Sequence, residues 1–128
     1  MDMRITSFGY LHGPAPADAH IQLDLHQHFG APHRDPSLRD LTVGHHKVIR
    51  AVRNTPGIRQ LLAATVAQAQ SYARGRGAKH PLHIAVGRAE GRHLAGVTAY
   101  LLARRLRRRG HQVELVHRAA PPRADHAA

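Results

Sequence analysis

Residues 82–118 read LHIAVGRAEGRHLAGVTAYLLARRLRRRGHQVELVHR, and this segment gives the strongest indication of fold class. Apolar residues alternate with other residues over 82–86 and again over 113–117, which predicts two strands. Between them, apolar residues recur at helical spacing from about 91 to 109, which predicts an amphipathic helix. A strand–helix–strand unit implies parallel pairing with a right-handed crossover. We therefore expect an α/β fold.

The preceding part of the chain adds four elements. The patterns predict strands at 4–8 and 21–25 and helices at about 45–53 and 56–74. Thr55 and Pro56 suit the N-cap and first position of the second helix. The expected architecture is a mostly parallel sheet of about four strands with about three helices.

Length and composition limit the alternatives. The chain has 128 residues and no Cys, which fits one compact domain without disulfides, Cys-ligated zinc or a thiol nucleophile. We expect this domain to span residues 1–118 and the tail 119–128 to be disordered. No apolar run approaches the roughly 18 residues of a membrane span, and no signal peptide is evident. These features predict a cytoplasmic protein.

The charge is strongly positive and unevenly distributed. The formal net charge is +11 at pH 7. Residues 1–40 hold three Arg and five Asp, whereas residues 41–128 hold 16 basic and three acidic residues. This asymmetry indicates a phosphate-rich partner such as RNA, DNA or an anionic metabolite. Coding bias is the alternative; it explains why 17 of the 19 basic residues are Arg, but not why acids are so few.

Arginines at the end of the last predicted helix are the first candidates for RNA contacts. They are Arg104, Arg105, Arg107, Arg108 and Arg109, with Arg50 and Arg53 on an earlier helix. The RNA hypothesis extends the strip of phosphate contacts to Arg59, Arg74 and Arg76. The helix dipole favours cations in a last turn, so a solvated helix end is the alternative interpretation. Aromatic residues make up only 4% of the chain, which favours recognition of RNA shape and backbone over base stacking.

A glycine-flanked turn between the strand at 82–86 and the next helix is a candidate anion site. In open α/β sheets, ligands bind at the carboxyl ends of the strands, and a helix N-terminus presents unpaired N–H groups to an anion. The candidate residues here are Gly87, Arg88, Gly91, Arg92 and His93. An ordinary turn with exposed basic residues is the alternative.

Several short motifs occur together in a specific order. They are Ile5-Thr6-Ser7-Phe8-Gly9-Tyr10-x-x-Gly13, Asp24-Leu25, Pro32-His33, Leu38-Arg39-x-Leu41-Thr42, Val86-Gly87-x-x-x-Gly91-x-His93 and Glu114-Leu115-Val116-His117-Arg118. With these motifs the chain resembles the C-terminal domain of the RNase adapter family RapZ over about residues 3–118.

The resemblance implies an α/β domain similar to a phosphofructokinase subdomain. Family members bind small RNAs, some bind an amino-sugar phosphate, and they assemble into oligomers through this domain. The resemblance also makes His33 a candidate anion contact beside Gly87, Gly91 and His93. Full-length members carry an N-terminal P-loop domain. This chain contains no P-loop motif, so we expect a stand-alone form that does not hydrolyse ATP.

The chain departs from the family in the loop at 87–94. The family has a Cys and, six positions later, an Arg, which Arg88 and Leu94 replace here. Ala89 and Glu90 stand where the family has Thr and Gly. The nucleophile of covalent phosphate chemistry and the bidentate phosphate clamp are therefore absent. We expect a protein that is not an enzyme.

Thirteen histidines raise the question of a metal site. His26 and His28 are two apart at the end of a predicted strand, and with His33 or His45-His46 they could complete a His₃ zinc site. Exposed loop histidines are the commoner outcome. We therefore expect no metal and no cofactor, with His26, His28 and His33 as weak candidates.

Three functions remain open. The first is a non-catalytic RNA-binding adapter or regulatory domain. The second is a sensor of a phosphorylated metabolite, an amino-sugar phosphate or a nucleotide, bound at residues 87–93. The third is an oligomeric module for protein interaction. We also expect the chain to form a homo-oligomer.

Overall fold

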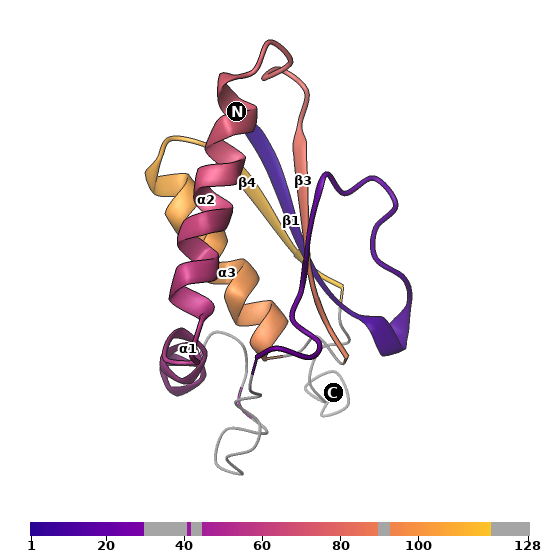
Figure 1. The fold of residues 1–128 in the computed structure, drawn as a ribbon, viewed down its shortest axis with the longest axis vertical. Helices are drawn as coiled ribbons and strands as arrows, with labels where there is room; N and C mark the ends of the chain where they lie inside the picture. The colour runs from indigo at the N-terminus through magenta and orange to yellow at the C-terminus, as the bar shows by residue number, and fades with distance from the viewer. Residues whose placement is uncertain (30–40, 42–44, 90–92, 119–128) are drawn as a thin grey trace, which may run out of the picture.

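The computed structural model describes residues 1–29, 41, 45–89 and 93–118 (Figure 1). Four strands and three α-helices form one small α/β domain, as predicted. In chain order the elements are β1 (Asp2–Gly9), the short 3₁₀ helix η1 (Tyr10–His12), β2 (Ile21–Asp24), α1 (His46–Arg53), α2 (Ile58–Arg74), β3 (Leu82–Arg88), α3 (Leu94–Arg108) and β4 (Gln112–His117). The predicted tail at 119–128 lies outside the described residues.

The sheet is entirely parallel, with strand order β2-β3-β1-β4. Ile5 of β1 pairs with Ile84 of β3 on one side and with Leu115 of β4 on the other. The prediction that the strands flanking the last helix pair directly is therefore wrong, because β1 lies between them. Residues 5–9 of β1 are all buried, and a strand buried on both faces belongs at the centre of a parallel sheet.

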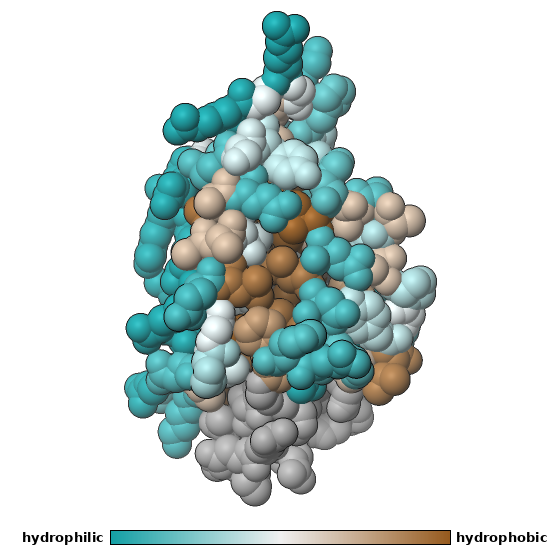
Figure 2. All heavy atoms as spheres, viewed as in Figure 1, coloured by the Kyte–Doolittle hydropathy of each residue, from teal (hydrophilic) through white to brown (hydrophobic). Residues whose placement is uncertain are grey.

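The helices cover one face of the sheet and the segment 10–20 covers the other (Figure 1). The chain moves across the sheet in one direction from β1 to β2 and in the opposite direction from β2 to β3 to β4. If every crossover is right-handed, the connection from β1 to β2 lies on one face of the sheet, and the connections from β2 to β3 and from β3 to β4 lie on the other. Figure 2, viewed from the same side, shows hydrophobic residues in the middle of this face of the molecule and mostly hydrophilic residues around them.

Helix α3 is the centre of the helical layer. It contacts β1, β3 and β4 and packs against α1 and α2. The predicted apolar stripe is buried in full: Ala95, Ala99, Leu102, Ala103 and Leu106. Burial extends beyond the stripe to Val97, Thr98 and Leu101 because neighbours surround most of the helix.

The start of α2 differs from the prediction. Thr55 does not cap this helix; its Oγ1 donates to the carbonyl of Ala51, 2.9 Å away, at the end of α1. Gly57 has a φ of +91° and occupies the N-cap position, so α2 begins at Ile58. A Thr hydroxyl often bonds the carbonyl four residues earlier, and glycine adopts positive φ without steric cost. These two local features move the helix start by two residues.

The outer face of the sheet has a polar layer that the sequence patterns do not indicate. His83 of β3 lies between Asp18 and Thr6: its Nδ1 is 3.0 Å from Asp18 Oδ1 and its Nε2 is 2.8 Å from Thr6 Oγ1. Donation from Nδ1–H to the carboxylate and from the hydroxyl to Nε2 satisfies all three groups. Arg118 Nη2 donates to the carbonyl of Pro14 at 2.6 Å. These bonds attach the segment 10–20 to the sheet.

Candidate nucleic-acid interface

The five arginines near the end of α3 separate into two groups. The guanidinium of Arg104 lies 5.8 Å from the ring centroid of Tyr100, a cation–π contact. Arg107 Nη2 donates to the carbonyl of Val113 at 2.7 Å and so connects α3 with β4. Arg104 and Arg107 therefore make contacts within the domain. The other three arginines line a groove.

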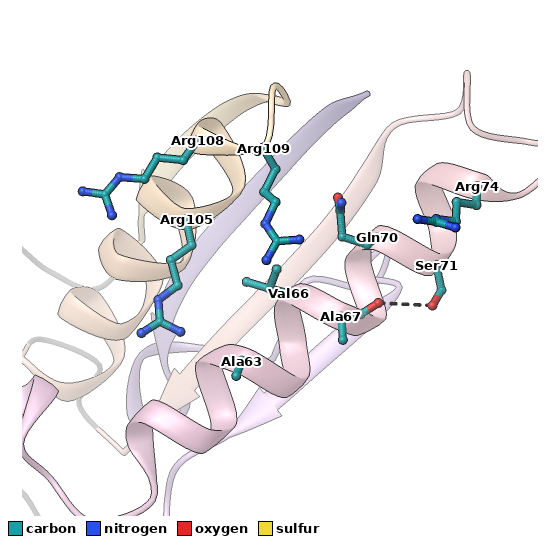
Figure 3. Close-up of a pocket in the computed structure, with 9 residues that line it drawn as sticks. All are labelled: Ala63, Val66, Ala67, Gln70, Ser71, Arg74, Arg105, Arg108 and Arg109. Atoms are coloured by element: carbon teal, nitrogen blue, oxygen red, sulfur yellow. Dashed lines mark hydrogen bonds between the residues drawn. The ribbon is translucent and has the colours of Figure 1, made fainter.

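This arginine groove lies between α2 and α3 and has a volume of about 700 Å³ (Figure 3). Its basic residues are Arg74, Arg105, Arg108 and Arg109, over a floor of small or neutral side chains from α2, among them Ala63, Val66, Ala67, Gln70 and Ser71. Figure 3 shows Arg105 and Arg109 extending into the space between the helices and Arg108 turned outward. No carboxylate of the described residues lines the groove or pairs with its four arginines.

Helix geometry explains how four cations are tolerated in one place. Arg74 is the last residue of α2, and Arg105 and Arg108 lie in the last turn of α3, so both helices end at the groove. The partial negative charge of a helix C-terminus stabilises nearby cations. It offsets part of the mutual repulsion and leaves the guanidinium groups available for an external anion.

His111 supports one wall of the groove. Its Nε2 forms a hydrogen bond with Oε1 of Gln70, which connects the loop after α3 to α2. The pKa of His111 is lowered, first by burial and then by the positive charges of the N-terminal amino group and Arg109. The ring is therefore neutral near pH 7 and adds no cation beside the four arginines.

Arg50 and Arg53 do not join this groove. They lie on α1, which precedes α2 in the chain, whereas the groove runs along α2 from Ala63 to Arg74 and is not lined by any residue of α1. Arg50 is exposed and Arg53 is half-buried. The predicted RNA-contacting arginines thus occupy two separate regions of the helical layer.

The turn after β3 contains the predicted anion-binding residues. Gly87 is buried inside β3, where a Cβ would lie 2.4 Å from Cζ of Phe8, so its lack of a side chain has a packing reason. Arg88 is half-buried at the carboxyl end of β3, and its Nε is buried without a hydrogen-bond partner among the described residues. Gly91, Arg92 and His33 lie outside the described residues.

His93 precedes α3 and is 5% exposed. Its Nε2 lies 2.7 Å from the carbonyl oxygen of Leu41, to which the protonated nitrogen donates. The ring therefore ties residue 41 to the start of α3. Its part in anion binding stays a prediction.

A polar pair at the carboxyl ends of β1 and β4 was missed by the sequence patterns. Ser7 Oγ lies 2.7 Å from His117 Nδ1, and the amide of Arg118 donates to the carbonyl of Ser7 at 2.7 Å. Burial lowers the pKa of His117. The strand register brings the two residues opposite each other, and residues 110 apart show no such signal in the sequence.

The histidines proposed as metal ligands do not form a cluster in the described part of the chain. His26 and His28 are both exposed just after β2, and the backbone N–H of His26 donates to Asp24 Oδ1 at 2.8 Å. Across residues 1–29, 41, 45–89 and 93–118, no group of three or more metal-ligating side chains occurs. In the same ranges, no helix has the length and hydropathy to cross a membrane.

The fold and the groove define a small parallel α/β domain with a concentrated basic surface. The chain belongs to the RapZ C-terminal domain family, whose family model matches residues 1–121. It is 37% identical over 118 residues to a nucleotide-binding protein of Rhodospirillum centenum. It is 34% identical over 116 residues to nucleotide-binding proteins of Thermobifida fusca and Streptomyces avermitilis. Each match covers 89% of this chain but only 34–39% of the relative.

Proposed function

We propose that this domain is a non-catalytic adapter or regulatory domain that binds RNA through backbone phosphates in the arginine groove. The observation that carries the proposal is the set of four arginines at the ends of α2 and α3, without a carboxylate among the described residues that line the groove. Guanidinium groups suit phosphate oxygens because they donate two parallel hydrogen bonds. The membership of the chain in the RapZ C-terminal domain family supports the same function.

The first test is fluorescence anisotropy with a structured RNA and a matched duplex DNA, from about 50 to 300 mM salt. We expect tighter binding to the RNA and an affinity that falls linearly with log salt, because bound arginines release counterions from phosphates. RNA recovered at its original length after incubation would support the absence of catalysis.

A matched pair of variants locates the binding surface. Arg105→Gln/Arg108→Gln/Arg109→Gln removes three charges from the groove, and Arg50→Gln/Arg53→Gln/Arg59→Gln removes three from the other end of the helical layer. We expect the groove variant to bind RNA at least tenfold more weakly, with a salt slope smaller by about 2.7, which is about 0.9 for each lost phosphate contact. Equal weakening by both variants would contradict the groove and indicate attraction by net charge alone.

A second candidate function is binding of a phosphorylated metabolite at the turn after β3. The observation that favours it is the Nε of Arg88 at the carboxyl end of the sheet, which is buried without a hydrogen-bond partner among the described residues. Amino-sugar phosphates and nucleotides at millimolar concentration should then raise the melting temperature, and Arg88→Ala should remove the effect. No shift with any of these compounds would exclude this function.

A further inference from the structure

A second hollow of about 390 Å³ lies next to the arginine groove. It is bounded by the end of α2, the loop that follows, the start of β3 and His20. Met1, Pro81 and Leu82 provide apolar side chains, and none of the lining side chains is permanently charged, although Met1 also carries the positive N-terminal amino group. Tyr72 lines the hollow and is 40% exposed. The aromatic ring and the apolar side chains suit a flat ring system.

The hollow and the groove adjoin at one residue. Ser71 lines both of them, and it is followed by Tyr72 on the side of the hollow and Arg74 on the side of the groove. Figure 3 shows Ser71 and Arg74 close together on the last turns of α2, with Arg105 and Arg109 across the groove. Because Ser71 lines both spaces, an RNA held by its phosphates in the groove can place an adjoining base in the hollow that Tyr72 lines.

His20 adds a hydrogen-bond donor to the hollow. Its Nδ1 accepts the backbone N–H of His83 at 3.0 Å, so the neutral ring carries its proton on Nε2. The rings of His20 and Tyr72 are 6.3 Å apart and inclined at 54°. The hollow thus combines an aromatic face with a donor for the carbonyl oxygens or ring nitrogens of a base.

We propose that this hollow binds one unpaired nucleobase, stacked on Tyr72, of an RNA whose phosphates occupy the arginine groove. The inference rests on the proposed function of the groove. It also modifies the expectation from composition that recognition of RNA shape and backbone is favoured over base stacking. A low aromatic content does not prevent stacking when one Tyr lies beside the phosphate site, because every base presents a stacking face.

The test compares two versions of one RNA hairpin, one with blunt ends and one with a short single-stranded overhang that carries 2-aminopurine. We expect the wild-type protein to bind the overhang hairpin roughly tenfold more tightly and to quench the 2-aminopurine fluorescence by stacking. Tyr72→Phe should keep both effects. Tyr72→Ala should lose both effects and still bind the blunt hairpin with wild-type affinity. Leu11→Ala, at another large apolar side chain that is exposed among the described residues, is the matched control and should behave as wild type.

The outcomes separate this inference from the proposed function. If neither hairpin binds, the proposed function is wrong and the inference fails with it. If both hairpins bind equally and 2-aminopurine is not quenched by the wild-type protein, RNA binding by the groove stands and the base pocket is wrong. A preference that persists in Tyr72→Ala would also overturn the pocket. The quenching measurement uses the wild-type protein, so its result does not depend on whether a variant folds.

Discussion

Phe8 of β1 packs directly over Gly87 of β3, its partner in the parallel register. A Cβ at position 87 would lie between 2.4 and 2.9 Å from three atoms of the Phe8 ring. The rings of Tyr10 and Phe8 meet edge-on with their centroids 4.8 Å apart, and the Arg118 guanidinium lies 5.7 Å from the centroid of the Phe8 ring. One glycine thus supports the packing of the outer face of the sheet and the segment that covers it.

This contact predicts that Gly87→Ala is destabilising. The added methyl group forces Phe8 to move, and such overpacking lowers the free energy of unfolding by about 1–3 kcal/mol. Urea denaturation measures the change. The matched variant Gly87→Ala/Phe8→Leu makes room for the methyl group, so its loss should be smaller than the sum of the two single losses. Strict additivity of the two losses would show that the contact is not the cause.

Because His117 is buried, we expect the free energy of unfolding to decrease as the pH falls. Burial lowers its pKa in the folded protein, whereas the unfolded chain takes up the proton near the ordinary value of about 6.5. Below that pH the unfolded state binds more protons, so the free energy of unfolding decreases. His111 has the same direction of shift and contributes in the same sense.

The test compares urea midpoints at about pH 7.5 and pH 5. His117→Asn keeps an acceptor for Ser7 but cannot titrate, so the decrease in stability between the two values should be smaller than in the wild type. His12→Asn, in the exposed η1 turn, is the control and should retain the full decrease. An unchanged pH dependence in the His117 variant would contradict the assignment.

Local patterns predict the elements well because helices and strands depend on periodic burial. The strand at 82–86 and the helical stripe of α3 are both confirmed. The strand order could not be predicted in the same way. A strand–helix–strand pattern contains no information on whether another strand, here β1, lies between the two.

The basic surface was only partly predictable. Charge counts indicated the end of α3, but they treated Arg104 and Arg107 as equal to Arg105. Arg104 makes a cation–π contact with Tyr100, and Arg107 donates a hydrogen bond to Val113, both within the domain. The patterns did not indicate the position of Tyr72 beside the arginine groove, because the hollow that it lines is formed by segments distant in the sequence. The patterns show which residues carry charge, and only the fold shows which of them meet.

The polar layer of the outer face makes a third prediction. Thr6 is 3% exposed and its hydroxyl is 2.8 Å from His83 Nε2. Thr6→Val keeps the shape but leaves this nitrogen buried without a partner, which should lower the free energy of unfolding by about 1–3 kcal/mol. Thr6→Ser keeps the hydroxyl and controls for its loss. A Val variant no less stable than the Ser variant would show that the hydrogen bond contributes little.

The separation of the arginines of α3 makes the last prediction. Arg107 is bonded to the carbonyl of Val113, whereas Arg108 lines the groove without an ion pair among the described residues. Arg107→Gln should lower the free energy of unfolding by about 0.5 kcal/mol or more and leave the salt dependence of RNA binding intact. Arg108→Gln should leave stability almost unchanged and reduce the salt slope by about 0.9, as expected for one lost phosphate contact. The two variants remove the same charge from the same helical turn. If both variants reduce the salt slope equally, RNA binding depends on the net charge of this helix end and not on which arginine lines the groove.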